Sequence, residues 1–286
     1  MRSRSTEPRA SRALYTYPEH LRAAAQAAPA APGVYIFQAE GDTLPLYIGK
    51  SINLRARLLA HLRNPDEARM LRQATHIAHI RTAGEIGALL LEAQLIKQQQ
   101  PLFNQKLRRN RQLCALHLPP ERPGAVEVVN ARTMDFARTP QLYGLYPGRT
   151  AALQALQALA DAHQLCCGAL GLETLPPGRA CFGAMLGRCR GVCCGKESPA
   201  AHAQRLHAAL ESLRIATWPY SGAIGLHEQG EALQHIHVVR NWCYLGSADT
   251  LPQARALAQV AAGFDADGYK ILCRPILTGQ LPVVVL

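Results

Sequence analysis

The sequence predicts an α+β protein, in which a small β-β-α-β-α module is followed by a second mixed α/β domain with a cysteine-rich loop. Three observations predict this class. The first hundred residues change between strand-like and helix-like periodicity. Residues 149–164 have the pattern of an amphipathic helix, and six of the nine cysteines fall between positions 166 and 194. A chain of 286 residues is long enough for two domains with their own cores.

The N-terminal part is expected to be a basic arm, residues 1–30, which is partly helical and ends at Pro29 and Pro32. Strands are then predicted over 33–38 and 44–48, joined by the turn AEGDT.

Leucines at helical spacing predict a helix over 51–63, with Ser51 or Asn53 as its N-cap. A third strand is predicted over 76–81. Thr82 and Glu85 then match a capping box that opens a second helix, which Pro101 ends. The module therefore occupies residues 31–108.

The remaining chain is expected to be a linker followed by a second domain. The linker is placed at 109–125 and the domain at 126–286. Within the domain we expect a strand or turn over 141–148, a helix over 149–164, a Gly/Pro-punctuated loop over 166–194, a helix over about 199–214 and a strand-rich tail from Gly222.

The charge of the chain indicates a polyanionic partner, because 31 Lys and Arg against 20 Asp and Glu give +11 and a pI near 9.5. A basic solvated surface without a specific partner is the alternative. No apolar run approaches the ~18 residues of a membrane span, and the start lacks a secretory signal, so we expect no membrane partner and a cytoplasmic location. The run NQKLRRNR is expected to follow a DNA backbone through Lys106, Arg108, Arg109 and Arg111.

The module also carries the residue types that phosphodiester chemistry needs. Two tyrosines lie on neighbouring predicted strands, Gly49 is expected to allow a tight turn, and an Arg and a His four apart share a helix face. A carboxylate in the apolar run LLLEAQLI needs a partner or a metal. Each residue also has an ordinary structural explanation. The candidate site residues are Tyr35, Tyr47, Lys50, Arg57, His61, Glu92 and Asn104.

These residues resemble a known signature. Gly33-Val34-Tyr35 and Tyr47-Ile48-Gly49-Lys50 resemble the motif of the GIY-YIG endonucleases, and the later motifs look like the N-terminal nuclease domain of UvrC, the excision-repair enzyme. The segment 139–167 and the cysteine spacing at 181, 189 and 193 are similar to UvrC as well. No counterpart is recognised for its ribonuclease-H-like nuclease, its helix–hairpin–helix tail or its UvrB-binding coiled coil. The chain therefore resembles the short bacterial homologues of UvrC.

The resemblance implies a mechanism for the module. One Mg²⁺ or Mn²⁺ would be held by Glu92 and waters, with Arg57 stabilising the charge of the transition state. Tyr47 would be the general base for the attacking water, its pKa depressed by Lys50, Arg57 and the cation. In the same scheme His61 relays that proton or contacts phosphate, Tyr35 orients the nucleophile, and Asn104 holds the site together by hydrogen bonds.

The cysteine-rich loop is expected to bind metal, with buried reduced cysteines as the alternative. Cys181, Cys189 and Cys193 need a fourth ligand, for which Cys167 or Cys166 is available, and four thiolates suit either Zn²⁺ or an iron–sulfur cluster. The resemblance to UvrC favours Cys167 and a 4Fe–4S cluster.

The implied reaction is one incision 3′ of a bulky lesion in damaged double-stranded DNA, with UvrB as partner and UvrA acting upstream. Two alternatives stay open. A restriction or homing nuclease would read sequence by itself, and a nuclease-derived DNA-binding module would not cut. Comparing cleavage of damaged and undamaged duplex tests the first alternative. Under the second alternative, a Glu92→Ala variant should behave like the wild type.

Overall fold

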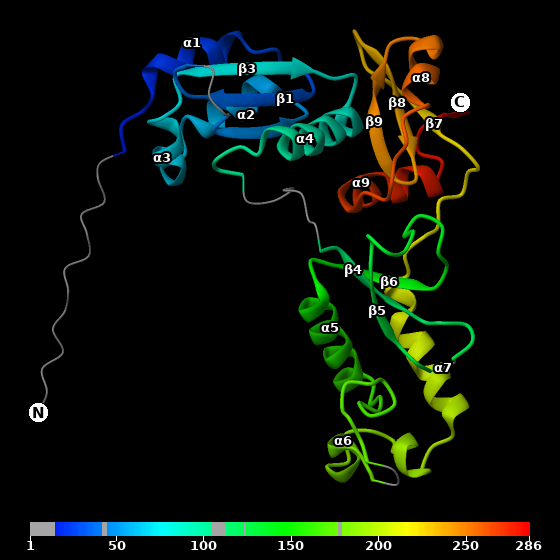
Figure 1. Ribbon diagram of the computed structural model, residues 1–286. Coiled ribbons are helices and arrows are strands. Elements are labelled where there is room, and N and C mark those ends of the chain that lie inside the picture. Colours follow the sequence, from blue (N-terminus) through cyan, green and yellow to red (C-terminus); the bar gives the residue numbers. More distant parts are fainter. Residues whose placement is uncertain (1–14, 42–44, 105–111, 123, 177–178) are drawn as a thin grey trace, which may run out of the picture. The chain divides into compact units, whose positions relative to one another are not determined.

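The computed structural model describes residues 15–41, 45–104, 112–122, 124–176 and 179–286. The described residues divide into two compact units (Figure 1). The first contains the residues up to 104 together with Glu228–His235, and the second contains the rest. No helix in the described ranges has the length and apolar character that crossing a membrane requires.

The first unit has the predicted β-β-α-β-α order, with an additional helix, α1, before β1 and a short helix, α3, after α2. A three-stranded antiparallel sheet of order β2-β1-β3 forms its centre. Its elements are α1 (Glu19–Ala27), β1 (Gly33–Gln38), β2 (Tyr47–Ser51), α2 (Leu54–His61), a 3-10 turn (Pro65–Glu67), α3 (Ala68–Leu71), β3 (His76–Arg81) and α4 (Glu85–Gln99).

The central strand β1 is buried on both faces, because successive side chains point to opposite sides of a strand. Tyr35 and Phe37 belong to the core cluster that contains residues of α1 and α2. Val34 and Ile36 pack in a cluster with Ile96 of α4. The helices therefore cover opposite faces of the sheet, and α4 lies against β1 and β2 (Figure 1).

The two helices of the module begin in different ways. Asn53 is the N-cap of α2, as predicted, and its Oδ1 accepts from the Ala56 amide at 3.0 Å. The capping box predicted for α4 is wrong, because the hydroxyl of Thr82 donates to the Gly84 carbonyl instead. The first amides of α4 are bound by the carboxylate of Glu228, which accepts from Ile86 and Gly87 at 2.8 and 2.9 Å.

The second unit contains most of two antiparallel sheets, of order β5-β4-β6 and β10-β7-β8-β9, while the last residues of β7 and the first of β8 fall within Glu228–His235 of the first unit. Its elements are β4 (Cys114–His117), β5 (Glu127–Asn130), β6 (Leu142–Tyr146), α5 (Arg149–Ala162), α6 (Phe182–Met185), a 3-10 turn (Val192–Cys194), α7 (Pro199–Leu210), a second turn (Glu211–Leu213), β7 (Ile224–Gln229), β8 (Gln234–Arg240), β9 (Cys243–Ala248), α8 (Leu251–Leu257), α9 (Ala266–Leu277) and β10 (Val283–Val285).

Two expectations for this part differ from the structure. The central strand β4 lies inside the segment expected to be a linker, and Ala115 and Leu116 on it are fully buried. The tail expected to be strand-rich also contains the helices α8 and α9. The four-residue strand β4 and the seven-residue helix α8 are too short for periodicity to identify. Helix α9 has twelve residues and an internal proline, Pro275, a residue that argues against a helix interior.

Candidate active site and cysteine cluster

The pairing of β1 with β2 brings the two tyrosine motifs together. Tyr35 lies opposite Gly49 in the register, and the rings of Tyr35 and Tyr47 are 6.2 Å apart. Gly49 lies within β2 and not at a turn, so the expected reason for this glycine is wrong. A Cβ at this position would be 2.3 Å from the Tyr35 hydroxyl oxygen, and glycine is needed because the tyrosine crosses directly over the backbone.

Helix α2 places Arg57 and His61 one turn apart, on the side of the sheet where Tyr35 points. The Tyr35 hydroxyl oxygen is 2.6 Å from Nε2 of His61 and accepts from Nε of Arg57 at 3.4 Å. His61 is only 3% exposed. Its Nδ1 contacts a carboxylate oxygen of Glu67, a residue that sequence reasoning missed.

Glu92 reaches the edge of β2 from α4, and its Oε1 accepts from the Lys50 amide at 3.0 Å. The Lys50 ammonium is 2.6 Å from Oε1 of Glu85, which lies on the first turn of the same helix. Asn104 is 7% exposed and bridges both backbone polar groups of Ile48, at 2.9 and 2.8 Å. The Asn104 side chain therefore fixes the position of β2 beside Glu92.

Both tyrosines are held neutral by their surroundings. Burial raises the pKa of Tyr35 strongly, and Tyr47 adds to the rise while Arg57 opposes it. Burial also raises the pKa of Tyr47, followed by the charge of Glu92, whereas Arg57 and a hydrogen bond with Tyr35 lower it by less. The expected depression of the Tyr47 pKa is therefore not found in the protein itself, because desolvation of the phenolate outweighs the nearby cations.

The two carboxylates of the site differ in their pKa shifts. Burial raises the pKa of Glu92, against the opposing effect of the Lys50 amide and of the Lys50 and Arg57 charges. Burial also acts to raise the pKa of Glu67, but hydrogen bonding and charge from His61, with smaller contributions from Asn64 and Arg57, leave it lowered overall. The surroundings of Glu67 thus favour its ionised form. For Glu92, the hydrogen bond and the nearby cations do not fully offset the cost of burying the charge.

The basic run that was expected to follow DNA lies outside the residues that the structure describes, and with it Lys106, Arg108, Arg109 and Arg111. Arg57, which is exposed, and Lys50, which is half-buried, are the cations of the described site.

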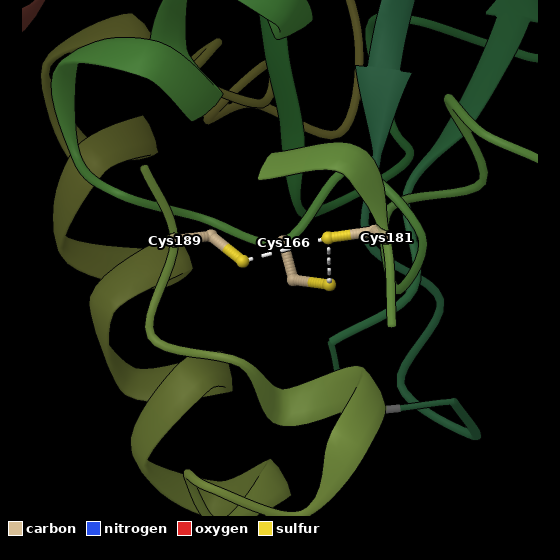
Figure 2. Close-up of side chains that lie close together, drawn as sticks. All are labelled: Cys166, Cys181 and Cys189. Carbon is tan, nitrogen blue, oxygen red and sulfur yellow. Dashed lines mark hydrogen bonds between the residues drawn. The ribbon is translucent and has the colours of Figure 1, made fainter. Parts of the chain in front are cut away.

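The cysteine-rich loop brings three sulfur atoms together, those of Cys166, Cys181 and Cys189, all within 4.8 Å of one another (Figure 2). The Cys181 sulfur is 3.6 Å from that of Cys166 and 3.5 Å from that of Cys189. The sulfur of Cys193 accepts from the Cys181 amide at 3.3 Å.

Cys166, and not the expected Cys167, lies in this group. The thiol of Cys167 instead contacts the side-chain amide of Gln157 on α5, at 3.5 Å. Consecutive side chains leave the backbone in different directions, so only one of the two can point into the group. His202 accepts from the Cys166 amide at 3.1 Å and fixes that segment.

Comparisons with known proteins find matches over most of the chain. Three family models match: "UvrC-like GIY-YIG domain" over residues 31–105, "UvrC/Cho excinuclease, middle domain" over 113–212 and "Excinuclease Cho C-terminal domain" over 223–286. The chain is 56% identical to excinuclease cho of Escherichia coli strain K12 over 286 residues, which covers 99% of this chain and 96% of that protein. It is 57% identical to excinuclease cho of Salmonella typhimurium over 274 residues, 96% of this chain and 92% of that one.

More distant relatives are also found. UvrABC system protein C of Thermus thermophilus is 33% identical over 187 residues, which covers 64% of this chain and 31% of that protein. A crystal structure of the GIY-YIG N-terminal endonuclease domain of UvrC from Thermotoga maritima, bound to magnesium as its catalytic divalent cation, is 38% identical. It covers 30% of this chain and 97% of that one, with a TM-score of 0.28.

Proposed function

Because the chain belongs to the Cho excinuclease family and is therefore a nuclease, we propose that it makes a single incision on the 3′ side of a bulky lesion. The substrate is damaged double-stranded DNA that UvrA and UvrB have prepared. The observation that supports one incision is one set of nuclease residues around Tyr35 and Glu92, in the domain that the nuclease family model matches. The models that match the rest of the chain are a middle and a C-terminal domain.

The carboxylate of Glu92 fits a divalent cation, Mg²⁺ or Mn²⁺. Among the described residues, one of its oxygens accepts from the Lys50 amide, and burial raises the Glu92 pKa, so a nearby cation would stabilise the ionised carboxylate. Oxygen ligands suit Mg²⁺, which keeps several waters when it binds to proteins. A bound cation would supply charge neutralisation at the scissile phosphate and the leaving 3′ oxygen.

The remaining side chains are assigned by their positions. Arg57 is exposed beside Tyr35, so its guanidinium can donate to a phosphate oxygen. The Lys50 ammonium forms an ion pair with Glu85, which holds its positive charge at the edge of β2. Tyr47 accepts the proton of the attacking water, and because its pKa is raised, that proton must be passed onward as it arrives.

The cysteine group is proposed to hold a 4Fe–4S cluster, with Zn²⁺ as the alternative, through Cys166, Cys181, Cys189 and Cys193. Three sulfurs within 4.8 Å and a fourth hydrogen-bonded to the same segment fit a set of thiolate ligands. A metal or cluster bound by these cysteines would link the loop that includes α6 to Cys166, which lies just after α5.

The test is incision of an end-labelled duplex that carries one bulky adduct, with UvrA, UvrB, ATP and Mg²⁺. We expect a single 3′-side cut by the wild-type protein and no cut by Glu92→Gln. Glu40→Gln, an exposed carboxylate of the same unit, is the matched control and should cut normally.

Other outcomes separate the alternatives. Equal cutting of undamaged duplex would favour a nuclease that selects its own sequence. Normal behaviour of Glu92→Gln would favour a DNA-binding module, and a second incision on the 5′ side would contradict the proposed single cut.

A further inference from the structure

A short turn between α2 and α3 brings a second carboxylate to the active site. Asn64 opens the turn, with its Oδ1 accepting from the Asp66 amide at 3.1 Å. The Nδ2 of the same Asn64 donates to Oε1 of Glu67 at 3.0 Å. One oxygen of Glu67 is therefore held by Asn64, and Oε2 is left in contact with Nδ1 of His61.

The imidazole of His61 is enclosed as well as hydrogen-bonded. The rings of Tyr35, Phe37 and Tyr47 lie at centroid distances of 5.1, 5.6 and 5.8 Å from it. With 3% exposure and a partner at each nitrogen, the ring has one orientation. An orientation fixed in this way, by packing and by a carboxylate, is what a proton acceptor in an active site requires.

The contact with Glu67 also determines where the proton of a neutral His61 lies. An ionised carboxylate only accepts, so Nδ1 must carry the hydrogen, and Nε2 is then an acceptor. Asn64 donates to the other oxygen of Glu67, and a donor of this kind favours the ionised carboxylate. The Tyr35 hydroxyl must therefore donate to Nε2, and its lone pairs are left to accept, as they do from Nε of Arg57.

We propose that Glu67 is a positioning residue of the incision reaction, which fixes the tautomer of His61 so that Nε2 receives the proton passed on by Tyr35. This inference rests on the proposed function. As water attacks phosphorus, its proton goes to the Tyr47 oxygen, the Tyr47 proton goes to the Tyr35 oxygen, and the Tyr35 proton goes to Nε2. His61 becomes an imidazolium that keeps its Nδ1 proton hydrogen-bonded to Glu67. The phosphorus–3′ oxygen bond breaks with its electron pair on that oxygen, which takes a proton from solvent water to become the 3′-hydroxyl.

A purely structural ion pair would give a different pattern of effects. If Glu67 only stabilised the turn, removing it would lower stability, and its effect on the rate would not depend on His61. If Glu67 acts through His61, the effect on the rate must disappear when His61 is absent. A Gln at position 67 can accept or donate, so it does not fix the tautomer.

The experiment is a double-mutant cycle on the full-length protein, with incision measured under single-turnover conditions. We expect Glu67→Gln to slow incision roughly 10-fold or more, part of the ~10²–10⁴-fold that general acid–base catalysis contributes. In a His61→Asn background the same change should leave the residual rate unaltered. Asp66→Asn, which removes a charge from the neighbouring exposed residue, is the control and should cut like wild type.

A second measurement needs neither DNA nor partner proteins. The ring nitrogens of His61 are observed by ¹⁵N NMR of histidine-labelled protein and assigned by their loss in His61→Asn. We expect a protonated Nδ1 in the wild type and a mixture of tautomers in Glu67→Gln. Equal slowing in both backgrounds, or unchanged nitrogen shifts in Glu67→Gln, would overturn the inference. Absence of incision by the wild type would contradict the proposed function, while the NMR result would still decide the tautomer.

Discussion

Replacing Gly49 with alanine should disturb the candidate active site at one atom, the hydroxyl oxygen of Tyr35. The new Cβ would lie 2.3 Å from the hydroxyl oxygen of Tyr35 and 2.5 Å from its Cζ, whereas ordinary contact begins at 3.4 Å. Tyr35 is 1% exposed, so its ring has little room to yield. The ring must move by about 1 Å, and a displacement of that size can cost ~100-fold in rate.

The consequence for the site follows from the hydrogen bond between Tyr35 and His61. The Tyr35 oxygen and Nε2 of His61 are only 2.6 Å apart. Moving the Tyr35 ring by about 1 Å along this direction would lengthen the distance beyond that of a normal hydrogen bond. Overpacking of this kind typically also costs about 1–3 kcal/mol of stability. We therefore expect Gly49→Ala to remain folded at low temperature, to unfold at a lower urea concentration and to incise DNA about 100-fold more slowly.

The assay is single-turnover incision of the adducted duplex, with urea unfolding measured on the same preparations. Gly263→Ala is the matched control, since a Cβ there meets nothing within 4 Å and the change should affect neither quantity. An incision rate for Gly49→Ala equal to that of the wild type would refute the argument that Tyr35 must lie directly over the strand.

Three further predictions concern other parts of the chain. Glu228→Ala should destabilise the first unit by about 1–3 kcal/mol and speed hydrogen exchange of the first amides of α4, and unchanged exchange would contradict the capping role. The folded-state pKa of Glu67 is lowered, so its contribution to stability is complete above its ordinary value of 4.5 and is lost as pH falls through the lowered value. The difference in unfolding free energy between wild type and Glu67→Gln should therefore shrink in acid, and a difference that is constant with pH would be inconsistent with this. Cys166→Ser should lose bound metal and visible absorbance after anaerobic purification while Cys167→Ser keeps them, and the reverse result would favour Cys167 as ligand.

The module was predictable from the sequence because its elements are long and regular. The bounds of β1 agree with the continuous apolar run from Val34 to Phe37, those of β3 with an alternating pattern, and α4 follows the apolar run around Glu92. Local pattern is sufficient where the burial of an element is continuous along its length, on one face or on both.

What escaped sequence reasoning depends on contacts between distant residues. Glu67 lies in a turn after α2, and nothing in the pattern of that turn indicates that its carboxylate points back to His61. Thr82 had the spacing of a capping residue, but Glu228 is the residue that binds the amides of α4. The choice between Cys166 and Cys167 depends on the direction of each side chain, which spacing does not contain.

The bond between Glu228 and the start of α4 has a consequence during protein synthesis. Gly87 and Glu228 are 141 positions apart. At about 5–20 residues per second, the ribosome needs roughly 7–28 s to make the intervening chain. For that time the residues of the nuclease strands and helices have been made, but the helix that carries Glu92 lacks the carboxylate that accepts from its first amides. A nascent chain therefore carries the residues for cutting DNA well before the part of the structure that holds them is complete.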